Sequence, residues 1–231
     1  MAGTTVCDQK EVETCFQKAA FQTGLNMTED EITAVQGWSK LFVFQKFWAK
    51  QGEIEEIAQE IVQKNINHSY SIFKQILENH YNTSEIIPTV GCLELFSFLQ
   101  ERKIKIALTT GFYRKVADII LEKLGWLYPN CPFSKGNQHI DCSLAGDEVI
   151  SGRPAPDMIY KCMEYLSISS CSEVINIGDT PSDLESGKRA GVRLSLGLTN
   201  GTHTRAQLEN YPNDGLFGSL NEFQLYLAEN I

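Results

Sequence analysis

The chain has 231 residues, of which 42% are hydrophobic and 21% charged, and its formal net charge is −9. These values exclude a disordered or fibrous protein. The acidic balance also disfavours nonspecific binding to nucleic acid or to an anionic membrane, since both need a basic surface. An anionic small molecule remains an acceptable ligand if local cations or a metal ion receive it.

The cysteine pattern indicates reduced thiols. The seven cysteines include no C-x-x-C pair, which predicts a cytoplasmic protein without structural disulfides. No apolar run approaches the length of about 18 residues that a membrane span needs, and the first residues lack the features of a secretion signal. Cys131, His139 and Cys142 match no zinc-binding spacing, so a zinc site is disfavoured.

Residues 8–80 predict helices only, because apolar residues recur there at helical spacing. Thr28 and Glu31 form a capping box that begins a second helix. Residues 39–50 predict a third helix, and residues 53–80 predict either one long helix or two in series.

After this block, short apolar strands alternate with helices. The expected strands are residues 104–108, 140–144, 174–177, 192–198 and a short one near Phe217. The expected helices are residues 92–101, 115–124, 156–166, 183–190 and one that begins at Asn221. This alternation predicts an α/β fold with a Rossmann-like parallel sheet. We therefore expect a core of residues 1–7 and 86–231, with an inserted all-helical cap of residues 8–85.

Polar loops follow the strands at the edge of the sheet where ligands of parallel α/β folds bind. They are Ala2-Gly3-Thr4-Thr5, Thr109-Thr110-Gly111, Gly152-Arg153-Pro154 and Gly178-Asp179-Thr180-Pro181-Ser182-Asp183. Two carboxylates four residues apart suit Mg²⁺, and a hydroxyl beside a guanidinium suits phosphoryl oxygens. Each residue also has an alternative role, because aspartate is a good helix N-cap and an arginine between prolines is often a surface residue.

The motifs AGTT, LTTG, GRPAPDM and GDTPSD, in this order, resemble the haloacid dehalogenase superfamily of phosphoryl-transfer enzymes. The similarity is greatest to phosphonatase (phosphonoacetaldehyde hydrolase) and the phosphonatase-like hydrolases, and it covers essentially the whole chain. The resemblance implies an α/β core of the haloacid dehalogenase type, a mobile helical cap between the first two motifs, and Mg²⁺ as cofactor. It also suggests a homodimer that pairs through the cap.

The resemblance further implies a role for each motif residue. Thr110 would bond a phosphoryl oxygen, with Thr109 a less favoured candidate, and Gly111 would lie beside the phosphate. Arg153 would neutralise the charge of the phosphoryl group and the nucleophile. Mg²⁺ would be held by Asp179, by the carbonyl of Ala2 and by Asp183, which binds or supports it, while the amide of Gly3 would face the phosphate.

The family nucleophile is an aspartate one position before the residue that is Met1 here, at the end of a central strand. Both the aspartate and its strand are absent from this sequence. We therefore expect an N-terminally truncated chain, in which Met1 is an internal methionine of a longer parent. The chain as written is not expected to form an aspartyl-phosphate.

Two residues favour cleavage of a carbon–phosphorus bond. Ala2 stands where most phosphatases of the superfamily have an aspartate that protonates an oxygen leaving group. Lys40 follows Gly37 by three residues, as the imine-forming lysine of the phosphonatase cap does. Gln36 and Val43 depart from that family, which has a methionine and a histidine at these positions.

The sequence therefore favours an Mg²⁺-dependent hydrolase that converts phosphonoacetaldehyde into acetaldehyde and phosphate. Two alternatives remain open, a phosphatase of small phosphomonoesters and an inactive phosphate-binding homologue. In each case the partner is a small phosphonate or phosphate, and neither nucleic acid nor a membrane is expected.

Overall fold

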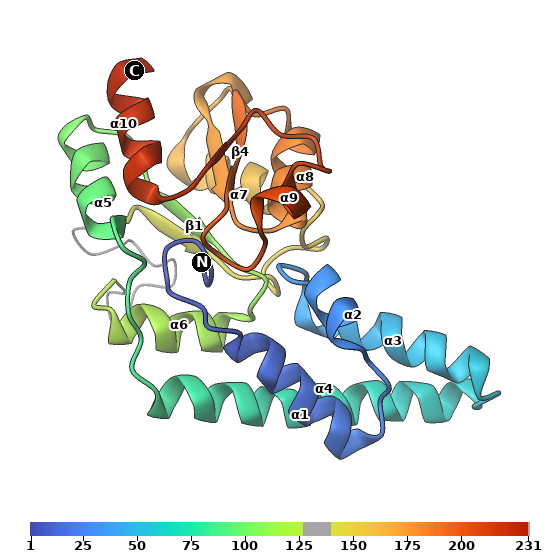
Figure 1. The fold of residues 1–231 in the computed structure, drawn as a ribbon. Helices are drawn as coiled ribbons and strands as arrows, with labels where there is room; N and C mark the ends of the chain where they lie inside the picture. The colour runs from blue at the N-terminus through green and yellow to red at the C-terminus, as the bar shows by residue number, and fades with distance from the viewer. Residues whose placement is uncertain (127–139, 231) are drawn as a thin grey trace.

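The computed structural model describes residues 1–126 and 140–230 (Figure 1). Its N-terminal part is a layer of helices, as the sequence predicts. The helices are α1 (Glu11–Thr23), α2 (Glu29–Ala34), α3 (Lys40–Ile54) and α4 (Gln59–Thr83). The single helix α4 decides between the two alternatives for residues 53–80, and α1 and α3 both pack along it. The exact domain boundaries stay a prediction.

Aromatic side chains form the centre of this helical layer. The rings of Phe16, Phe44 and Phe73 lie 4.4 to 5.5 Å from one another, and all three side chains are fully buried. Below them, the indole of Trp48 donates a hydrogen bond to the Ser69 hydroxyl over 2.8 Å. This burial, rather than intrinsic helix propensity, supplies most of the stability of such helices.

The rest of the chain is an α/β unit in which every predicted strand and helix is present. Its strands are β1 (Ala107–Thr109), β2 (Cys142–Leu144), β3 (Ile175–Gly178), β4 (Leu194–Leu198) and β5 (Gly215–Phe217). Its helices are α5 (Cys92–Glu101), α6 (Arg114–Lys123), α7 (Asp157–Leu166), the 3₁₀ turn Cys171–Glu173, α8 (Pro181–Ala190), α9 (Arg205–Leu208) and α10 (Leu220–Asn230). Helices α7 and α8 pack on the strands, α10 packs on α5, and α6 contacts α4 of the helical layer.

The strands form two separate parallel sheets instead of one. β1 pairs with β2, and β3, β4 and β5 pair in that order. Within the described residues no strand joins β1 to β3. Ile175 and Ile177 of β3 are only partly buried, whereas strands inside a parallel sheet are normally buried on both faces. The interruption lies where the sequence predicts that the first core strand is missing.

A tight turn at the N-terminus connects the two sheets. The carbonyl of Met1 accepts hydrogen bonds from the amides of Thr4, Thr5 and Val6. The Met1 amino group donates to the carbonyl of Thr109 in β1 over 3.3 Å. The Thr4 hydroxyl donates to Asp179, directly after β3, over 2.7 Å. The turn thereby holds the ends of β1 and β3 together.

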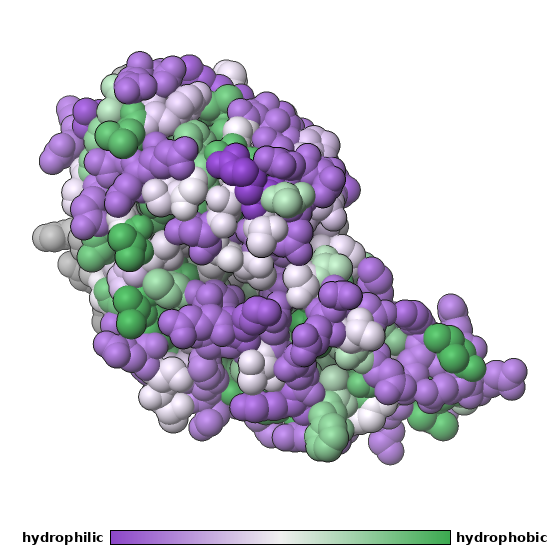
Figure 2. Space-filling model, viewed as in Figure 1, coloured by the Kyte–Doolittle hydropathy of each residue, from purple (hydrophilic) through white to green (hydrophobic). Residues whose placement is uncertain are grey.

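The molecular surface in Figure 2 is mainly hydrophilic, with separate small hydrophobic areas. Among the described residues, no helix combines the length and the apolar character that crossing a membrane requires. The cysteines at positions 7, 15, 92, 142, 162 and 171 are free thiols, as the sequence predicts.

The aromatic centre of the helical layer gives a stability prediction. Phe16→Ala removes a fully buried ring and should lower the free energy of unfolding by about 3–5 kcal/mol, because it leaves a cavity. Phe21→Ala, on the same helix at a position 90% exposed, is the matched control and should change it by less than about 0.5 kcal/mol. Urea denaturation of both variants measures the difference. Equal losses would contradict the assignment of Phe16 to the core.

Candidate active site

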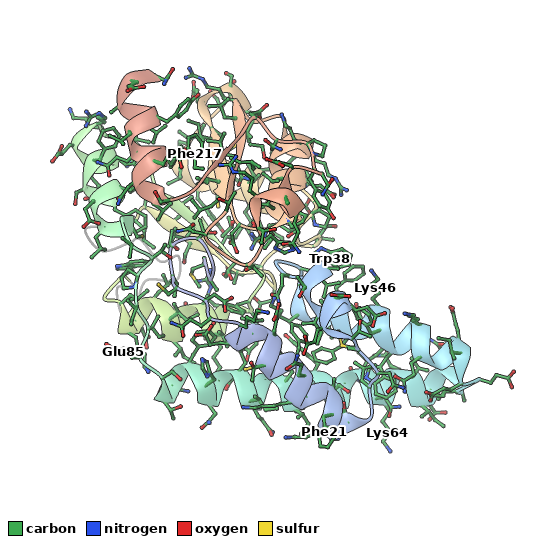
Figure 3. The ribbon with its side chains drawn as sticks, viewed as in Figure 1. Phe21, Trp38, Lys46, Lys64, Glu85 and Phe217 are labelled. Atoms are coloured by element: carbon green, nitrogen blue, oxygen red, sulfur yellow. The ribbon has the colours of Figure 1, made fainter. Side chains whose placement is uncertain are left out.

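A pocket lies where the helical layer meets the ends of β1 and β3. Its open volume is about 370 Å³, within the usual range for small-molecule sites. The α/β unit contributes Thr110, Arg153, Asp179 and Asp183 to the lining, and the helical layer contributes Gln36 and Lys40. Figure 3 shows the neighbouring Trp38 at the junction of the two parts of the molecule.

Two opposed glycines allow the two parts to approach each other closely. Gly37 has a φ of +81°, and a Cβ there would clash with the hydroxyls of Ser182 and Thr180. A Cβ on Gly111, after β1, would lie 2.6 Å from the carbonyl oxygen of Trp38. Only glycine allows such contact between backbones without displacement. The roof of the pocket thus rests directly on its walls.

Arg153 is the main cation of the α/β side. It is 8% exposed and forms an ion pair with Asp183. Burial lowers the pKa of Arg153 to about 10, although the Asp179 carboxylate acts in the opposite direction. The guanidinium therefore stays charged at neutral pH. Its Nε has no hydrogen-bond partner among the described residues, so it can still donate to a ligand.

Asp183 owes its position to the start of α8. Thr180 is the N-cap of this helix, and Asp183 completes a capping box by accepting hydrogen bonds from the Thr180 amide and hydroxyl over 3.1 and 2.7 Å. The sequence left capping and metal binding as alternatives for this aspartate. The capping role is present, and it aims the other carboxylate oxygen at Arg153.

Asp179 follows β3 and is 1% exposed. One of its oxygens accepts from the Thr4 hydroxyl, and the other accepts from the amide and the hydroxyl of Thr202 over 2.9 and 2.6 Å. These three donors fix the carboxylate at the base of the pocket. Thr202 lies in the loop after β4, a third strand end that contributes to the same site.

Lys40 begins α3 and points into the pocket rather than into solvent. It is 4% exposed, and its ammonium lies 5.5 Å from the centre of the Phe16 ring and 5.4 Å from that of Phe112. Burial lowers the pKa of Lys40 to about 7, and the charge of Arg153 acts in the same direction, while Asp8 opposes them. A substantial share of Lys40 is therefore a neutral amine at neutral pH, which is the nucleophilic form.

Asp8 lines the pocket at the junction between the N-terminal turn and α1. Its carboxylate accepts a hydrogen bond from the Glu11 amide over 3.2 Å. Burial, followed by the nearby Glu11 carboxyl, raises the pKa of Asp8 to about 7. A carboxyl with this pKa can exchange protons at neutral pH.

The donor set around the base of the pocket fits a magnesium ion. Asp179 and Asp183 present carboxylate oxygens, and Ala2 lines the same pocket with its main chain. Oxygen ligands from one or two carboxylates, completed by water and substrate, are what Mg²⁺ usually takes in proteins. No cluster of three or more histidine, cysteine or acidic side chains suitable for a metal occurs within residues 1–126 and 140–230.

The structure brings most of the predicted residues together, with two exceptions. Lys40, Thr110, Gly111, Arg153, Asp179, Asp183 and Ala2 all line the pocket. Thr109 does not, because it is the last residue of β1 and its carbonyl is engaged by the Met1 amino group. The amide of Gly3 donates to Val6 over 2.8 Å, so the expectation that it faces the phosphate is wrong in this conformation.

Three residues of the site were not predicted as such. Asp8 was expected to belong only to the linker into the cap, and Gln36 appeared only as a departure from a family pattern. Thr202 was detectable in principle, since it follows a predicted strand. Of the disfavoured zinc candidates, Cys131 and His139 lie outside the described residues, and Cys142 is buried in β2.

Comparisons with known proteins agree with this geometry. The family of haloacid dehalogenase-like hydrolases matches residues 3–196. A phosphonoacetaldehyde hydrolase of Latilactobacillus sakei is 29% identical over 188 residues, which cover 79% of this chain and 66% of that relative. The chain therefore spans slightly less than two thirds of the relative's length.

Solved structures share the fold at low sequence identity. A phosphonoacetaldehyde hydrolase like protein from Oleispira antarctica superposes with a TM-score of 0.73 at 19% identity, covering 100% of this chain and 92% of that one. A protein described as a predicted phosphoglycolate phosphatase from Haemophilus somnus gives 0.73 at 15% identity, covering 99% and 95%. These similarities establish the architecture, and the family match extends over most of the chain. The chain belongs to the haloacid dehalogenase-like hydrolase family.

Proposed function

We propose that this hydrolase cleaves the carbon–phosphorus bond of phosphonoacetaldehyde and produces acetaldehyde and phosphate. The observation that carries the proposal is the position of Lys40, a buried amine with a pKa of about 7 that shares a pocket with Arg153 and Thr110. The name of the Latilactobacillus sakei relative supports the same reaction.

In this mechanism the Lys40 Nζ attacks the aldehyde carbon, and loss of water gives an iminium ion. The electrons of the carbon–phosphorus bond then move into the enamine as the phosphoryl group is transferred. Protonation and hydrolysis of the enamine release acetaldehyde and regenerate the amine. The iminium is needed because an unassisted leaving group would be a carbanion.

We propose that the phosphoryl acceptor is the aspartate expected one position before Met1 in a longer parent. The support for it is the interruption between β1 and β3, which leaves room in the pairing order for the strand that carries this residue. Water would then hydrolyse the aspartyl-phosphate to phosphate.

The remaining residues of the pocket bind and orient the phosphoryl group. The Arg153 Nε and the Thr110 hydroxyl can donate to its oxygens, and both are on the α/β side of the pocket. Asp179, Asp183 and the main chain of Ala2 would hold Mg²⁺. When bound, Mg²⁺ supplies positive charge that offsets the charge of the phosphoryl oxygens.

A phosphatase acting on small phosphomonoesters is the second candidate. Its support is the shared fold with the Haemophilus somnus protein described as a predicted phosphoglycolate phosphatase. Against it, the methyl side chain of Ala2 cannot protonate an alcohol leaving group. The behaviour of Lys40 distinguishes the two reactions.

Borohydride trapping tests the imine. Incubation of the protein with phosphonoacetaldehyde and sodium borohydride should attach the reduced substrate to Lys40, as measured by peptide mass spectrometry. Lys40→Arg should abolish the adduct, because a guanidinium does not form the imine. Lys46→Arg is the matched control on the same helix and should retain it, since Lys46 is exposed. An active protein whose Lys40 remains unmodified would favour the phosphatase.

The lowered pKa of Lys40 predicts how its reactivity depends on pH. The neutral amine forms as the pH rises through about 7, so acetylation of Lys40 by acetic anhydride should be half-maximal there. The fraction of neutral amine should be about tenfold larger at pH 8 than at pH 6. Mass spectrometry of the Lys40 peptide after brief labelling measures this profile. A midpoint near the ordinary lysine value of about 10.4 would contradict the buried environment.

Metal binding can be measured without turnover. Asp179→Asn should weaken Mg²⁺ binding, measured by isothermal titration calorimetry, by at least about tenfold, because it removes one of the two carboxylate charges. Asp30→Asn, an exposed position on α2, is the matched control and should leave the affinity unchanged. Equal affinities in the two variants would exclude Asp179 as a ligand.

A further inference from the structure

Gln36 is a buried donor without a partner. Its side chain is 6% exposed and lines the pocket, and its Nε2 has no hydrogen-bond partner among the described residues. Most buried polar groups are hydrogen-bonded, because leaving one unpaired costs about 1–3 kcal/mol. A donor left free at the wall of a pocket indicates that a ligand supplies the missing acceptor.

The backbone of Gln36 is held on both sides, so the side chain keeps its direction. Its amide donates to the Thr33 carbonyl over 3.1 Å, and its carbonyl accepts from the Ser182 hydroxyl over 3.2 Å. The next residue, Gly37, lies against the hydroxyls of Thr180 and Ser182. These contacts connect Gln36 to the start of α8.

The polar groups of the pocket divide into two sets. Thr110 and Arg153, on the α/β side, suit the oxygens of the phosphorus group. Gln36 and Lys40 come from one segment of the helical layer and form the roof. The roof therefore faces the organic end of a substrate whose phosphorus group is bound below. In phosphonoacetaldehyde the hydrogen-bond acceptor at that end is the carbonyl oxygen.

We propose that Gln36 donates a hydrogen bond from Nε2 to the carbonyl oxygen of the carbon that Lys40 attacks. This inference rests on the proposed function. As the nitrogen of Lys40 bonds to the carbon, the electron pair of the C=O bond moves onto the oxygen. The oxygen then takes up a proton, becomes the hydroxyl of the carbinolamine and leaves as water after a second protonation. A donor aimed at this oxygen stabilises the charge that develops during the addition.

Gln36→Met tests the proposal, because methionine has a similar length and no donor. The rate of borohydride trapping at Lys40 with phosphonoacetaldehyde should fall on the order of 10- to 100-fold, the effect of losing a hydrogen bond to a charged acceptor. The affinity for inorganic phosphate, measured by calorimetry, should stay within about twofold of wild type. Gln45→Met, at an exposed position of α3, is the matched control and should trap at the wild-type rate.

A second variant tests the direction of the side chain. Gln36→Glu places a carboxylate in the roof beside Lys40, and a nearby negative charge favours the ammonium form. The pH midpoint of Lys40 labelling should therefore move upward, which a purely structural role of Gln36 would not cause. Thermal unfolding of each variant checks that the fold is retained.

The outcomes separate this inference from the proposed function. Absence of any Lys40 adduct in the wild-type protein would overturn both. Wild-type trapping with an unchanged rate in Gln36→Met would overturn only the role of Gln36. A loss of phosphate affinity equal to the loss of trapping would also overturn it, because the donor would then serve the phosphorus group. An unchanged midpoint in Gln36→Glu would show that the side chain does not face Lys40.

Discussion

The close contact between Gly37 of the helical layer and Gly111 of the α/β unit determines the properties of the site. A side chain at either position would separate the two backbones. The contact closes the pocket above Thr110 and Arg153 and removes Lys40 from water. Because burial is the main cause of the lowered pKa of Lys40, the nucleophilicity of the amine depends on this packing.

Charge is distributed so that two buried cations can occupy one pocket. Asp183 pairs with Arg153, and Asp179 is satisfied by the hydroxyls of Thr4 and Thr202. Lys40 has aromatic neighbours instead of a carboxylate partner. Arg153 thus stays charged for binding an anion, whereas Lys40 loses its proton easily. The same electrostatic repulsion that would be a defect in a structural core separates the roles of the two residues.

Sequence patterns predicted the elements well and the site in large part. Helical periodicity located α1 to α4, and the rule that ligands bind at strand ends found Thr110, Asp179 and Asp183. The direction of Lys40 could not be derived from spacing, since a lysine at a helix start is usually solvated, and only the resemblance to phosphonatase suggested it. The role of Asp8 and the free donor of Gln36 depend on tertiary contacts between segments distant in sequence. The amide of Gly3 was assigned wrongly because the turn of Met1–Val6 closes on itself.

The division of the strands into two sheets has a mechanical consequence. Thr110 is carried by the β1–β2 sheet, and Asp179 by the β3–β4–β5 sheet. In a continuous sheet, ladder hydrogen bonds would fix the separation of such residues rigidly. Here their spacing relies on the hydrogen bonds of one N-terminal turn and on the roof above them. The alignment of the anion-binding half with the metal-binding half is therefore only as stiff as those few links, and slight relative rotation of the two plates would detune both at once.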